Sequence, residues 1–310
     1  MSKVRDLIII GGAAAGVAAA IYAARRKLDF LIVSGDIGGE VLLSGEIENY
    51  PGILKTNGVD MTQRYTSQLD HYEVERELDT WVTDVQKKDN IVEVTAKKGE
   101  EIKTYQAKTV IITSGVKPRH LNVPGEDEFY QKGVTYCTVC DGPLFRNKTT
   151  ATIGTGNSAI ESALMMAEIS VKHYILLKYE DFKGETIMAD KLKAKENVEI
   201  LPQAMTTKIT GEKMVNGLDY TDKNGNTQHL DLQGIFVHIG MTPQSQFATH
   251  LDHDESGKFI INQLCSTNVP GIFAAGDVTN IPFQQIAIAS GQGATAALAA
   301  IEYINKLSSE

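Results

Sequence analysis

The sequence predicts an α/β protein with two Rossmann-like domains, each of three ββα layers, the second inserted into a discontinuous first. Two glycine-rich turns, at Gly11 and at Gly154, each lie between an apolar β-run and a helical segment. The end of the chain offers a further strand, GIFAAGDVTN at 271–280, and a Gly/Ala-rich helix after it. One such turn often marks only a tight loop, whereas two indicate two nucleotide-type folds.

The N-terminal segment has the pattern of a strand, a helix and a second strand. These are RDLIIIGG at 5–12, AAAGVAAAIYAARRK at 13–27 and DFLIVSG at 29–35. The turn from Gly11 to Gly16 is a G-x-G-x-x-G pattern with Ala13 in place of the middle glycine. Such a turn places a pyrophosphate at a helix N-terminus, where free N–H groups and the helix dipole favour anions. The Ala13 methyl group weakens the match.

The uncharged run from Leu7 to Ala24 is long enough to suggest a membrane span or a signal peptide. The basic residues follow this run, whereas in a signal peptide they precede it. The pair Gly11-Gly12 also divides the run into a β-rich and an Ala-rich half. We therefore favour a strand, turn and helix, and expect a cytoplasmic protein without a membrane partner.

The second glycine-rich turn has Gly154, Gly156 and Ala159 in the pattern G-x-G-x-x-A. Between the two turns, residues 91–115 predict a meander of alternating strands.

Two proline-containing segments, 116–128 and 234–247, look like an outgoing and a returning linker, and a final helix is expected over 284–307. The expected domains are 1–116 and 243–310 for the outer one and 117–242 for the inserted one.

Composition excludes some functions. The chain has 310 residues, 42% hydrophobic and 22% charged, which is ordinary for a globular protein. The net charge of −9 argues against a nucleic-acid partner, because a phosphate backbone needs a basic surface. Three cysteines cannot form a disulfide framework, and Cys265 is expected as a small buried side chain.

The stretch TYCTVCDG at 135–142 holds the other two cysteines, Cys137 and Cys140, followed by Asp141. A C-x-x-C pair supplies the attacking and the resolving thiol of disulfide exchange, and Asp141 can shuttle a proton to a leaving thiolate. The alternatives are a zinc site, which needs about four N or S ligands, and a structural pair. Asp141 has the further alternative of only capping a helix. No zinc-ribbon spacing is present, so the pattern favours redox chemistry and no metal.

Several motifs together resemble the low-molecular-weight thioredoxin reductases, over essentially the whole chain. The motifs are the turn at Gly11, GGEVLLSGEIENYPG, IITSGVKPRHLNVPGE, YCTVCDGPLFRNK, GTGNSAIESAL and GIFAAGDV, in this order. The resemblance implies a homodimeric enzyme with non-covalent FAD that reduces the disulfide of thioredoxin. It implies an FAD domain split around a central domain that carries the redox disulfide and rotates between two positions.

The resemblance also implies roles for individual residues. Cys140 would contact the flavin and Cys137 would attack the partner. The FAD pyrophosphate would lie on the turn of Gly11, Ala14 and Ala15. The other expected cofactor contacts are Ser34 and Gly35 near the adenosine ribose, Gly39 and Glu40 along the cofactor, Asn49, Gln285 and Ile286 at the flavin ring, Asp277 at the ribityl-phosphate region, and Val82, Ser114, Gly115 and Gly276.

The segment that would bind NADPH departs from the pattern of NADPH-linked members of the family. NADPH-linked members carry a basic block H-R-R-x-x-F-R after the second strand of the inserted domain, whereas this chain has LKYEDFKG at 177–184. The basic residues of this segment are Lys178 and Lys183, whose charges are offset by Glu180 and Asp181. The segment has no arginine whose guanidinium could bind a 2′-phosphate through two hydrogen bonds. At the strand end, Leu177, Lys178 and Tyr179 supply no carboxylate for the ribose of NAD, and Glu180 is only a candidate. The arginine expected before Gln285 is also absent.

The resemblance therefore shifts to the ferredoxin-dependent flavin thioredoxin reductases, with ferredoxin as a separate donor protein because three cysteines are too few for an iron–sulfur cluster. NAD(P)H and a deazaflavin stay open as donors. A reductase that feeds a peroxidase and a non-catalytic flavin redox sensor stay open as functions.

Overall fold

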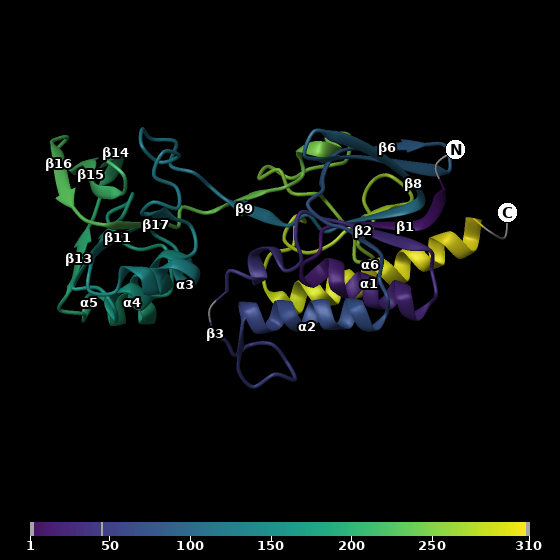
Figure 1. The fold of residues 1–310 in the computed structure, drawn as a ribbon, viewed down its shortest axis with the longest axis horizontal. Helices are drawn as coiled ribbons and strands as arrows, with labels where there is room; N and C mark the ends of the chain where they lie inside the picture. Colours follow the sequence, from purple (N-terminus) through teal and green to yellow (C-terminus); the bar gives the residue numbers. More distant parts are fainter. Residues whose placement is uncertain (1–2, 45, 308–310) are drawn as a thin grey trace. The chain divides into compact units, whose positions relative to one another are not determined.

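A computed structural model describes residues 3–44 and 46–307, without the side chains of Glu46 and Cys140. The chain forms two compact units: unit 1 is Met1–Lys117 with Thr242–Glu310, and unit 2 is Pro118–Met241 (Figure 1). Each unit is an α/β structure with a parallel sheet, so the predicted fold class is confirmed.

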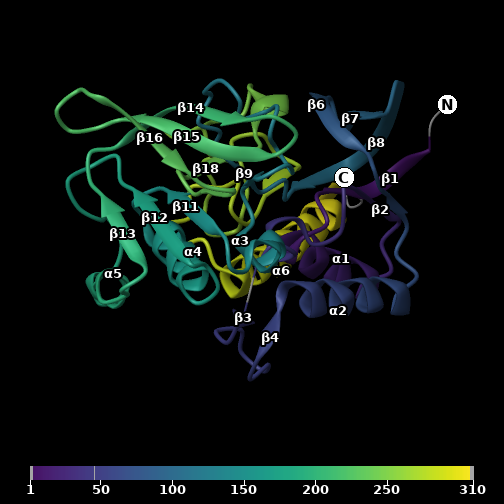
Figure 2. The ribbon, with the colours of Figure 1, turned by 60° about the vertical axis from the view of Figure 1, so that its left-hand side comes forward.

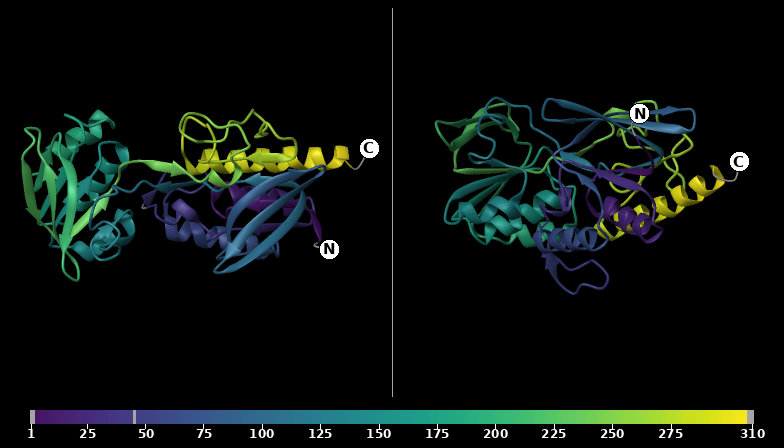
Figure 3. Two further views of the ribbon diagram at one scale, coloured as in Figure 1. Left: turned by 90° about the horizontal axis from the view of Figure 1, so that it is seen from above. Right: turned by 45° about the vertical axis from the view of Figure 1, so that its right-hand side comes forward.

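Unit 1 is built on a sheet in the order β5-β2-β1-β8-β7-β6, with β19 also paired to β8. Strands β5, β2, β1, β8 and β19 pair in parallel, and β6, β7 and β8 form antiparallel hairpins, the long blue ribbons of Figure 3. The strands are β1 Val4–Ile10, β2 Phe30–Val33, β3 Glu46–Ile47, β4 Thr56–Asn57, β5 Arg76–Glu77, β6 Trp81–Lys88, β7 Ile91–Lys98, β8 Glu101–Ile112 and β19 Ile272–Ala274. The helices are α1 Ala14–Arg25, α2 Gly58–His71 and α6 Ile286–Leu307, with 3-10 turns η1 Gly39–Val41 and η3 Gln246–Ala248.

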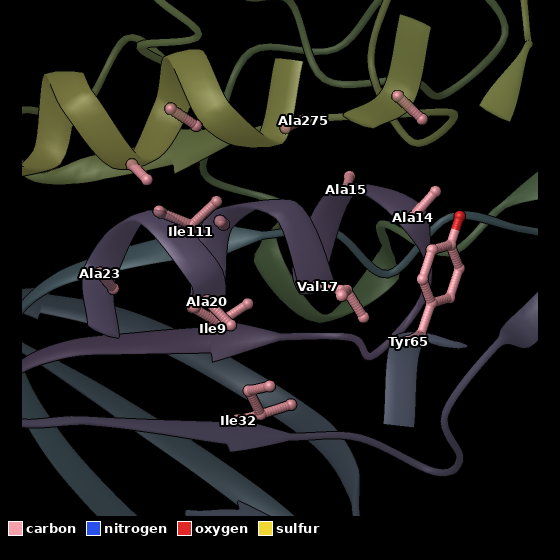
Figure 4. Close-up of a cluster of buried hydrophobic side chains, with 14 of the residues drawn as sticks. Ile9, Ala14, Ala15, Val17, Ala20, Ala23, Ile32, Tyr65, Ile111 and Ala275 are labelled. Atoms are coloured by element: carbon pink, nitrogen blue, oxygen red, sulfur yellow. The ribbon is translucent and has the colours of Figure 1, made fainter. Parts of the chain in front are cut away.

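The two faces of this sheet are buried by different elements. Side chains of β1 alternate, so that Leu7 and Ile9 join the core beneath the helices while Ile8 and Ile10 join the core shared with β6 and β7. Figure 4 shows α1 lying between α6 and the strands that carry Ile9 and Ile32.

Helices α1 and α6 pack closely because both are rich in small residues. A Cβ atom at Gly293 of α6 would lie 2.0 Å from the carbonyl oxygen of Ala15, so only glycine permits this contact. The apolar run from Leu7 to Ala24 is thus a strand and a helix of one folded unit. Among the described residues, no helix is both long and apolar enough to cross a membrane.

Unit 2 has a fully parallel sheet in the order β10-β17-β11-β12-β13 and a separate antiparallel sheet β14-β15-β16. Its strands are β10 Val134–Thr135, β11 Thr149–Ile153, β12 Lys172–Leu176, β13 Val198–Leu201, β14 Met205–Gly211, β15 Val215–Thr221, β16 Thr227–Asp231 and β17 Gly234–Val237. Its helices are α3 Thr138–Asp141, α4 Asn157–Ala167 and α5 Thr186–Lys193, with the 3-10 turn η2 Gly142–Phe145.

Helices and hairpins cover opposite faces of the parallel sheet of unit 2. Ile175 packs with α4 and α5, whereas its neighbours on β12 pack toward the antiparallel sheet (Figure 2). These layers correspond to the ββα arrangement expected of a Rossmann-like domain.

The connecting segments are shorter than the sequence suggested. Strands β9, Val116–Pro118, and β18, Met241–Pro243, pair with each other where the chain leaves and re-enters unit 1. Residues 234–247 were expected to be a returning linker that starts as a strand and continues to a proline. Gly234–Val237 is the buried strand β17 inside the sheet of unit 2, and its apolar side chains fill both faces of a parallel sheet.

Candidate active site

Unit 1 contains a cavity of about 480 Å³ at the carboxyl ends of β1 and β2. Five residues expected to bind the cofactor line it: Gly11, Ser34, Gly35, Val82 and Ser114. Four of these residues follow parallel strands, while Val82 lies on the antiparallel strand β6, and the cavity lies at the sheet edge where α/β proteins bind nucleotides.

The turn that begins at Gly11 depends on backbone geometry. Gly11 has φ +105°, and a Cβ there would lie 2.3 Å from the carbonyl oxygen of Thr113. Helix α1 starts after Ala13 without a side-chain cap, and no acidic side chain lies in its first turn. The N–H groups of a first helical turn have no intrahelical partner. Ala14 and Ala15, both buried, lie in this turn, which suits an anionic group such as a pyrophosphate.

The structure shows where the Ala13 methyl group of the first glycine-rich turn lies. A Cβ at Gly39, which has φ +50°, would lie 3.3 Å from the Ala13 methyl group. The methyl group therefore faces the backbone of Gly39. Gly39 and Glu40 open the 3-10 turn η1, so these two expected residues do lie beside the first glycine-rich turn.

Two carboxyl groups in this region, those of Glu40 and Asp277, have raised pKa values. Burial, with the charges of Asp277 and Asp36, raises the pKa of Glu40 to about 7, while Lys117 opposes the effect. Burial also raises the pKa of Asp277, with Lys258 opposing. Such partly buried acceptors fit a ligand that offers hydroxyl donors, as a ribose or a ribityl chain does.

Two expected flavin-ring residues from distant parts of the chain are in contact. Asn49 Nδ2 donates to Gln285 Oε1 at 3.0 Å, and Ile286 begins α6 directly after Gln285. The remaining two expected residues, Gly276 and Gly115, are held by hydrogen bonds to residues elsewhere in the sequence. Gly276 has φ +80° and donates its N–H to Gln292 Oε1 at 2.7 Å, and the carbonyl of Gly115 accepts from the N–H of Gln244 at 3.0 Å.

Sequence reasoning missed nine of the residues that line the cavity, among them Trp81 and Lys117. The Trp81 side chain lines the cavity yet is 52% exposed, and the Lys117 ammonium lies 4.5 Å from its ring centroid. A Cβ at Gly35 would lie 2.2 Å from the Trp81 ring, so Gly35 leaves room for the indole. The available signal was that the only tryptophan of the chain precedes Val82.

The cavity and its surroundings fit a dinucleotide such as FAD. The uncapped helix start at Ala13 suits the pyrophosphate, the acceptors Glu40 and Asp277 suit sugar hydroxyls, and the exposed face of Trp81 suits a heteroaromatic ring.

Unit 2 carries the redox segment. Cys137 is disulfide-bonded and directly precedes α3. The side chain of Cys140 lies outside the described part of the chain, so its pairing with Cys137 stays a prediction. Cys265 of unit 1 is a free, buried thiol that donates to the carbonyl of Gln292 at 3.5 Å, and burial raises its pKa to about 11.

Thr135 connects Asp141 to Cys137. The Thr135 hydroxyl donates to Asp141 Oδ2 at 2.5 Å and accepts from the backbone N–H of Cys137 at 3.1 Å. Asp141 stands at the start of η2, but its carboxylate makes no capping hydrogen bond there. The carboxylate is thus held toward the cysteine segment, and the capping role considered for it is not the one it has here.

The second glycine-rich turn packs closely against a neighbouring backbone segment. A Cβ at Gly154 would lie 2.1 Å from the carbonyl oxygen of His238, so this position has no room for a side chain. The loop after β12 folds onto this turn: the N–H of Lys183 donates to the carbonyl of Thr155 at 2.8 Å, and a Cβ at Gly184 would lie 2.4 Å from Asn157 Oδ1.

Three charged side chains of the loop after β12, those of Lys178, Asp181 and Lys183, have partners in the loop itself or in α5. The ammonium groups of Lys178 and Lys183 lie 5.8 and 5.2 Å from the centroid of the Tyr179 ring. Asp181 pairs with Lys193 at 3.3 Å, and a hydrogen bond from the N–H of Phe182, together with Lys193, lowers its pKa. No arginine stands in this loop.

Among the described residues, no group of three or more His, Cys, Asp and Glu side chains could hold a metal ion.

Known proteins resemble this chain in sequence and in structure. The sequence profile described as pyridine nucleotide-disulphide oxidoreductase matches residues 5–293. An alkyl hydroperoxide reductase subunit of Staphylococcus aureus (strain NCTC 8325 / PS 47) is 41% identical over 302 residues, which cover 96% of this chain and 59% of that protein. The chain therefore spans about three fifths of the length of this curated relative.

Two solved structures bear on the subdivision of the family. The thioredoxin reductase of Lactococcus lactis is 31% identical, with a TM-score of 0.88 and coverage of 97% of this chain and 99% of that one. A ferredoxin-flavin thioredoxin reductase of Clostridium acetobutylicum is 26% identical, with a TM-score of 0.54 and full coverage of both chains, 100% each. The chain belongs to the pyridine nucleotide-disulphide oxidoreductase family, and its structure is similar to that of the Lactococcus lactis thioredoxin reductase.

Proposed function

We propose that this protein is an FAD-dependent thioredoxin-disulfide reductase that takes electrons from reduced ferredoxin. The observation that carries the proposal is the disulfide-bonded Cys137, with the Asp141 carboxylate linked to it through Thr135. The dinucleotide cavity of unit 1 supplies the place for the cofactor. The roles of Cys137, Cys140 and Asp141, and the homodimer, belong to this proposal.

In the proposed reaction, Cys137, Cys140 and Asp141 have different roles. Bound FAD supplies the electron pair that opens the disulfide. Cys137, as a thiolate, then attacks the disulfide of thioredoxin, and Cys140 resolves the mixed disulfide by attacking Cys137. Asp141, held by Thr135 beside the N–H of Cys137, gives a proton to the thiolate that leaves.

The proposed donor rests on the loop after β12. Proteins bind a 2′-phosphate through charge-assisted hydrogen bonds worth about 1.5–3 kcal/mol each. The loss of several of these hydrogen bonds therefore lowers the affinity for NADPH by orders of magnitude. Here the ammonium groups of both lysines lie over the Tyr179 ring, and Leu177, Lys178 and Tyr179 at the strand end supply no carboxylate for the ribose of NAD. A protein donor that delivers electrons to the flavin needs neither group.

An anaerobic titration of the purified yellow protein tests the donor. We expect reduced ferredoxin to bleach the flavin rapidly, and NADPH and NADH to act slowly or only at high concentration. Thioredoxin added afterwards should restore the flavin absorbance as its own disulfide is reduced. Rapid bleaching by micromolar NADPH or NADH would overturn ferredoxin as the donor and leave the disulfide chemistry intact.

A second acceptor is favoured by the relative from Staphylococcus aureus, which belongs to an alkyl hydroperoxide reductase. In this alternative the Cys137 disulfide would reduce a hydroperoxide-reducing partner protein. The two acceptors are separated by measuring turnover with thioredoxin and with a thiol peroxidase plus a hydroperoxide. Turnover with neither, combined with a reversible disulfide, would favour a redox sensor over an enzyme.

A further inference from the structure

The Thr138 hydroxyl, between the two cysteines of the redox segment, begins a chain of hydrogen bonds inside unit 2. Its Oγ1 lies 2.9 Å from His238 Nε2 and 2.6 Å from Ser162 Oγ. Ser162 Oγ in turn lies 3.0 Å from Thr152 Oγ1. The redox segment is therefore joined by a side chain to α4 and to the central strand β11.

The chain of hydrogen bonds continues along the face of the sheet that α4 covers. Thr152 Oγ1 lies 3.1 Å from Nε2 of His173, and Nδ1 of the same ring lies 2.8 Å from Thr150 Oγ1. Thr150 Oγ1 then lies 2.7 Å from Ser170 Oγ. Five hydroxyls and two imidazoles thus form one unbroken series from His238 to Ser170.

This series can be fully satisfied. Burial lowers the pKa of His173 to about 3 and that of His238 to about 4, so both rings are neutral at pH 7. A neutral imidazole has one donor and one acceptor nitrogen, and a hydroxyl can donate once and accept once. All donors can therefore run from Ser170 toward His238, or all in the opposite direction, so that each hydrogen bond of the series has one donor and one acceptor.

Such polar groups are unusual at this place. Central strands of parallel sheets are usually rich in Val and Ile, yet the buried Thr150 and Thr152 occupy β11. A buried polar network is stable only when each member is paired, and it then fixes one arrangement of the elements that it joins. Here it joins α3, which has only four residues and cannot hold its own shape.

We propose that His238 and Ser162 are positioning residues for the redox segment, acting through the Thr138 hydroxyl to hold Cys137 where its disulfide closes. The inference rests on the proposed function only in taking Cys137 as the redox-active sulfur. The contact is present while Cys137 is disulfide-bonded. Loss of the contact should therefore lower the effective concentration of one sulfur near the other and make the disulfide easier to reduce.

The test compares two variants that remove one hydroxyl each from the same series. Thr138→Val removes the hydroxyl on α3, and Thr150→Val removes one between His173 and Ser170, away from the redox segment. The holoenzyme is equilibrated with mixtures of reduced and oxidised dithiothreitol, and reduced Cys137 is trapped with an alkylating reagent and measured by mass spectrometry. Reduction breaks the disulfide and forms two thiols, with two electrons and two protons supplied as dithiothreitol closes to its cyclic disulfide.

We expect Thr138→Val to need about threefold to tenfold less reduced dithiothreitol at the midpoint, which corresponds to one buried hydrogen bond. Thr150→Val should leave the midpoint unchanged although both variants lower the urea midpoint of unfolding. Equal shifts in the two variants, or none in Thr138→Val, would overturn the proposal, because the hydroxyl would then act on stability alone.

Further variants keep the test decisive if Thr138→Val fails to fold. Thr138→Ser keeps the hydroxyl and His238→Gln keeps a hydrogen-bonding group, so both should retain the midpoint, whereas His238→Leu should shift it. A shift in His238→Gln as large as that in His238→Leu would count against positioning. The measurement needs neither an electron donor nor thioredoxin, so the inference can succeed even where the proposed function fails.

Discussion

Replacing Glu40 by glutamine separates the effect of this residue on stability from its effect on cofactor binding. Burial raises the pKa of Glu40 from 4.5 to about 7, and the charges of Asp277 and Asp36 add to this shift. The folded protein without cofactor therefore holds an ionised Glu40 poorly above neutral pH. Glutamine has nearly the same shape and no charge to desolvate.

The magnitude and sign follow from the two pKa values. Below about pH 4.5 the carboxyl is protonated in both states, and glutamine should change nothing. Between pH 4.5 and 7 only the unfolded chain ionises, so the folded protein loses stability as pH rises, and the full cost is present above pH 7. At about 1.4 kcal/mol per pKa unit the cost is at most about 3.5 kcal/mol, and solvent screening of this partly exposed group reduces it to about 2 kcal/mol.

The assay is urea unfolding of the protein stripped of flavin, followed by the fluorescence of Trp81, the only tryptophan. Glu40→Gln should be more stable than the parent by about 2 kcal/mol at pH 8 and equal to it near pH 4.5. The same variant should bind FAD about tenfold or more weakly, because a charged hydrogen-bond acceptor is lost. A gain in stability that does not depend on pH, or unchanged FAD affinity, would refute this account of Glu40.

Three further changes test other parts of the molecule. Cys137→Ser should abolish reduction of thioredoxin while the protein stays yellow, which the flavin spectrum and an insulin-reduction assay would show. Asp141→Asn should lower the rate of thiol–disulfide exchange by about 10²–10⁴-fold with unchanged FAD content, and stopped-flow measurement would detect it. Gly293→Ala should destabilise unit 1 by about 1–3 kcal/mol, because the new Cβ meets the Ala15 carbonyl at 2.0 Å; an unchanged melting temperature would contradict this packing.

The sequence was informative where local pattern decides the structure. The run of apolar residues from Leu7 to Ile10, the alanines that follow and the run from Phe30 predicted β1, α1 and β2, because short apolar runs and Ala-rich segments have few alternatives around a Gly-Gly break. The final helix was predicted to start at 284 and starts at Ile286. Helix ends depend on capping groups from other segments, which a local pattern does not contain.

Contacts between segments that are far apart in the chain could not be predicted from the sequence. The Thr-Thr-Ala-Thr-Ile stretch at 149–153 predicted a strand, since threonine favours strands whether or not its hydroxyl is bonded. That Thr152 pairs with Ser162 and His173 depends on how β11, α4 and β12 pack. Trp81 escaped notice for the same reason, because its place above Gly35 is set by the pairing of strands far apart in the chain.

Ala13 shows how a motif can fail as a pattern and still meet its physical requirement. The middle glycine of the turn is needed so that the backbone can come close to a pyrophosphate, and a methyl group there seemed to block the approach. In the structure that methyl group lies against Gly39, whose own lack of a Cβ leaves the space for it. Two positions therefore share one steric condition, and a larger residue at Gly39 should damage the first turn as much as one at Ala13.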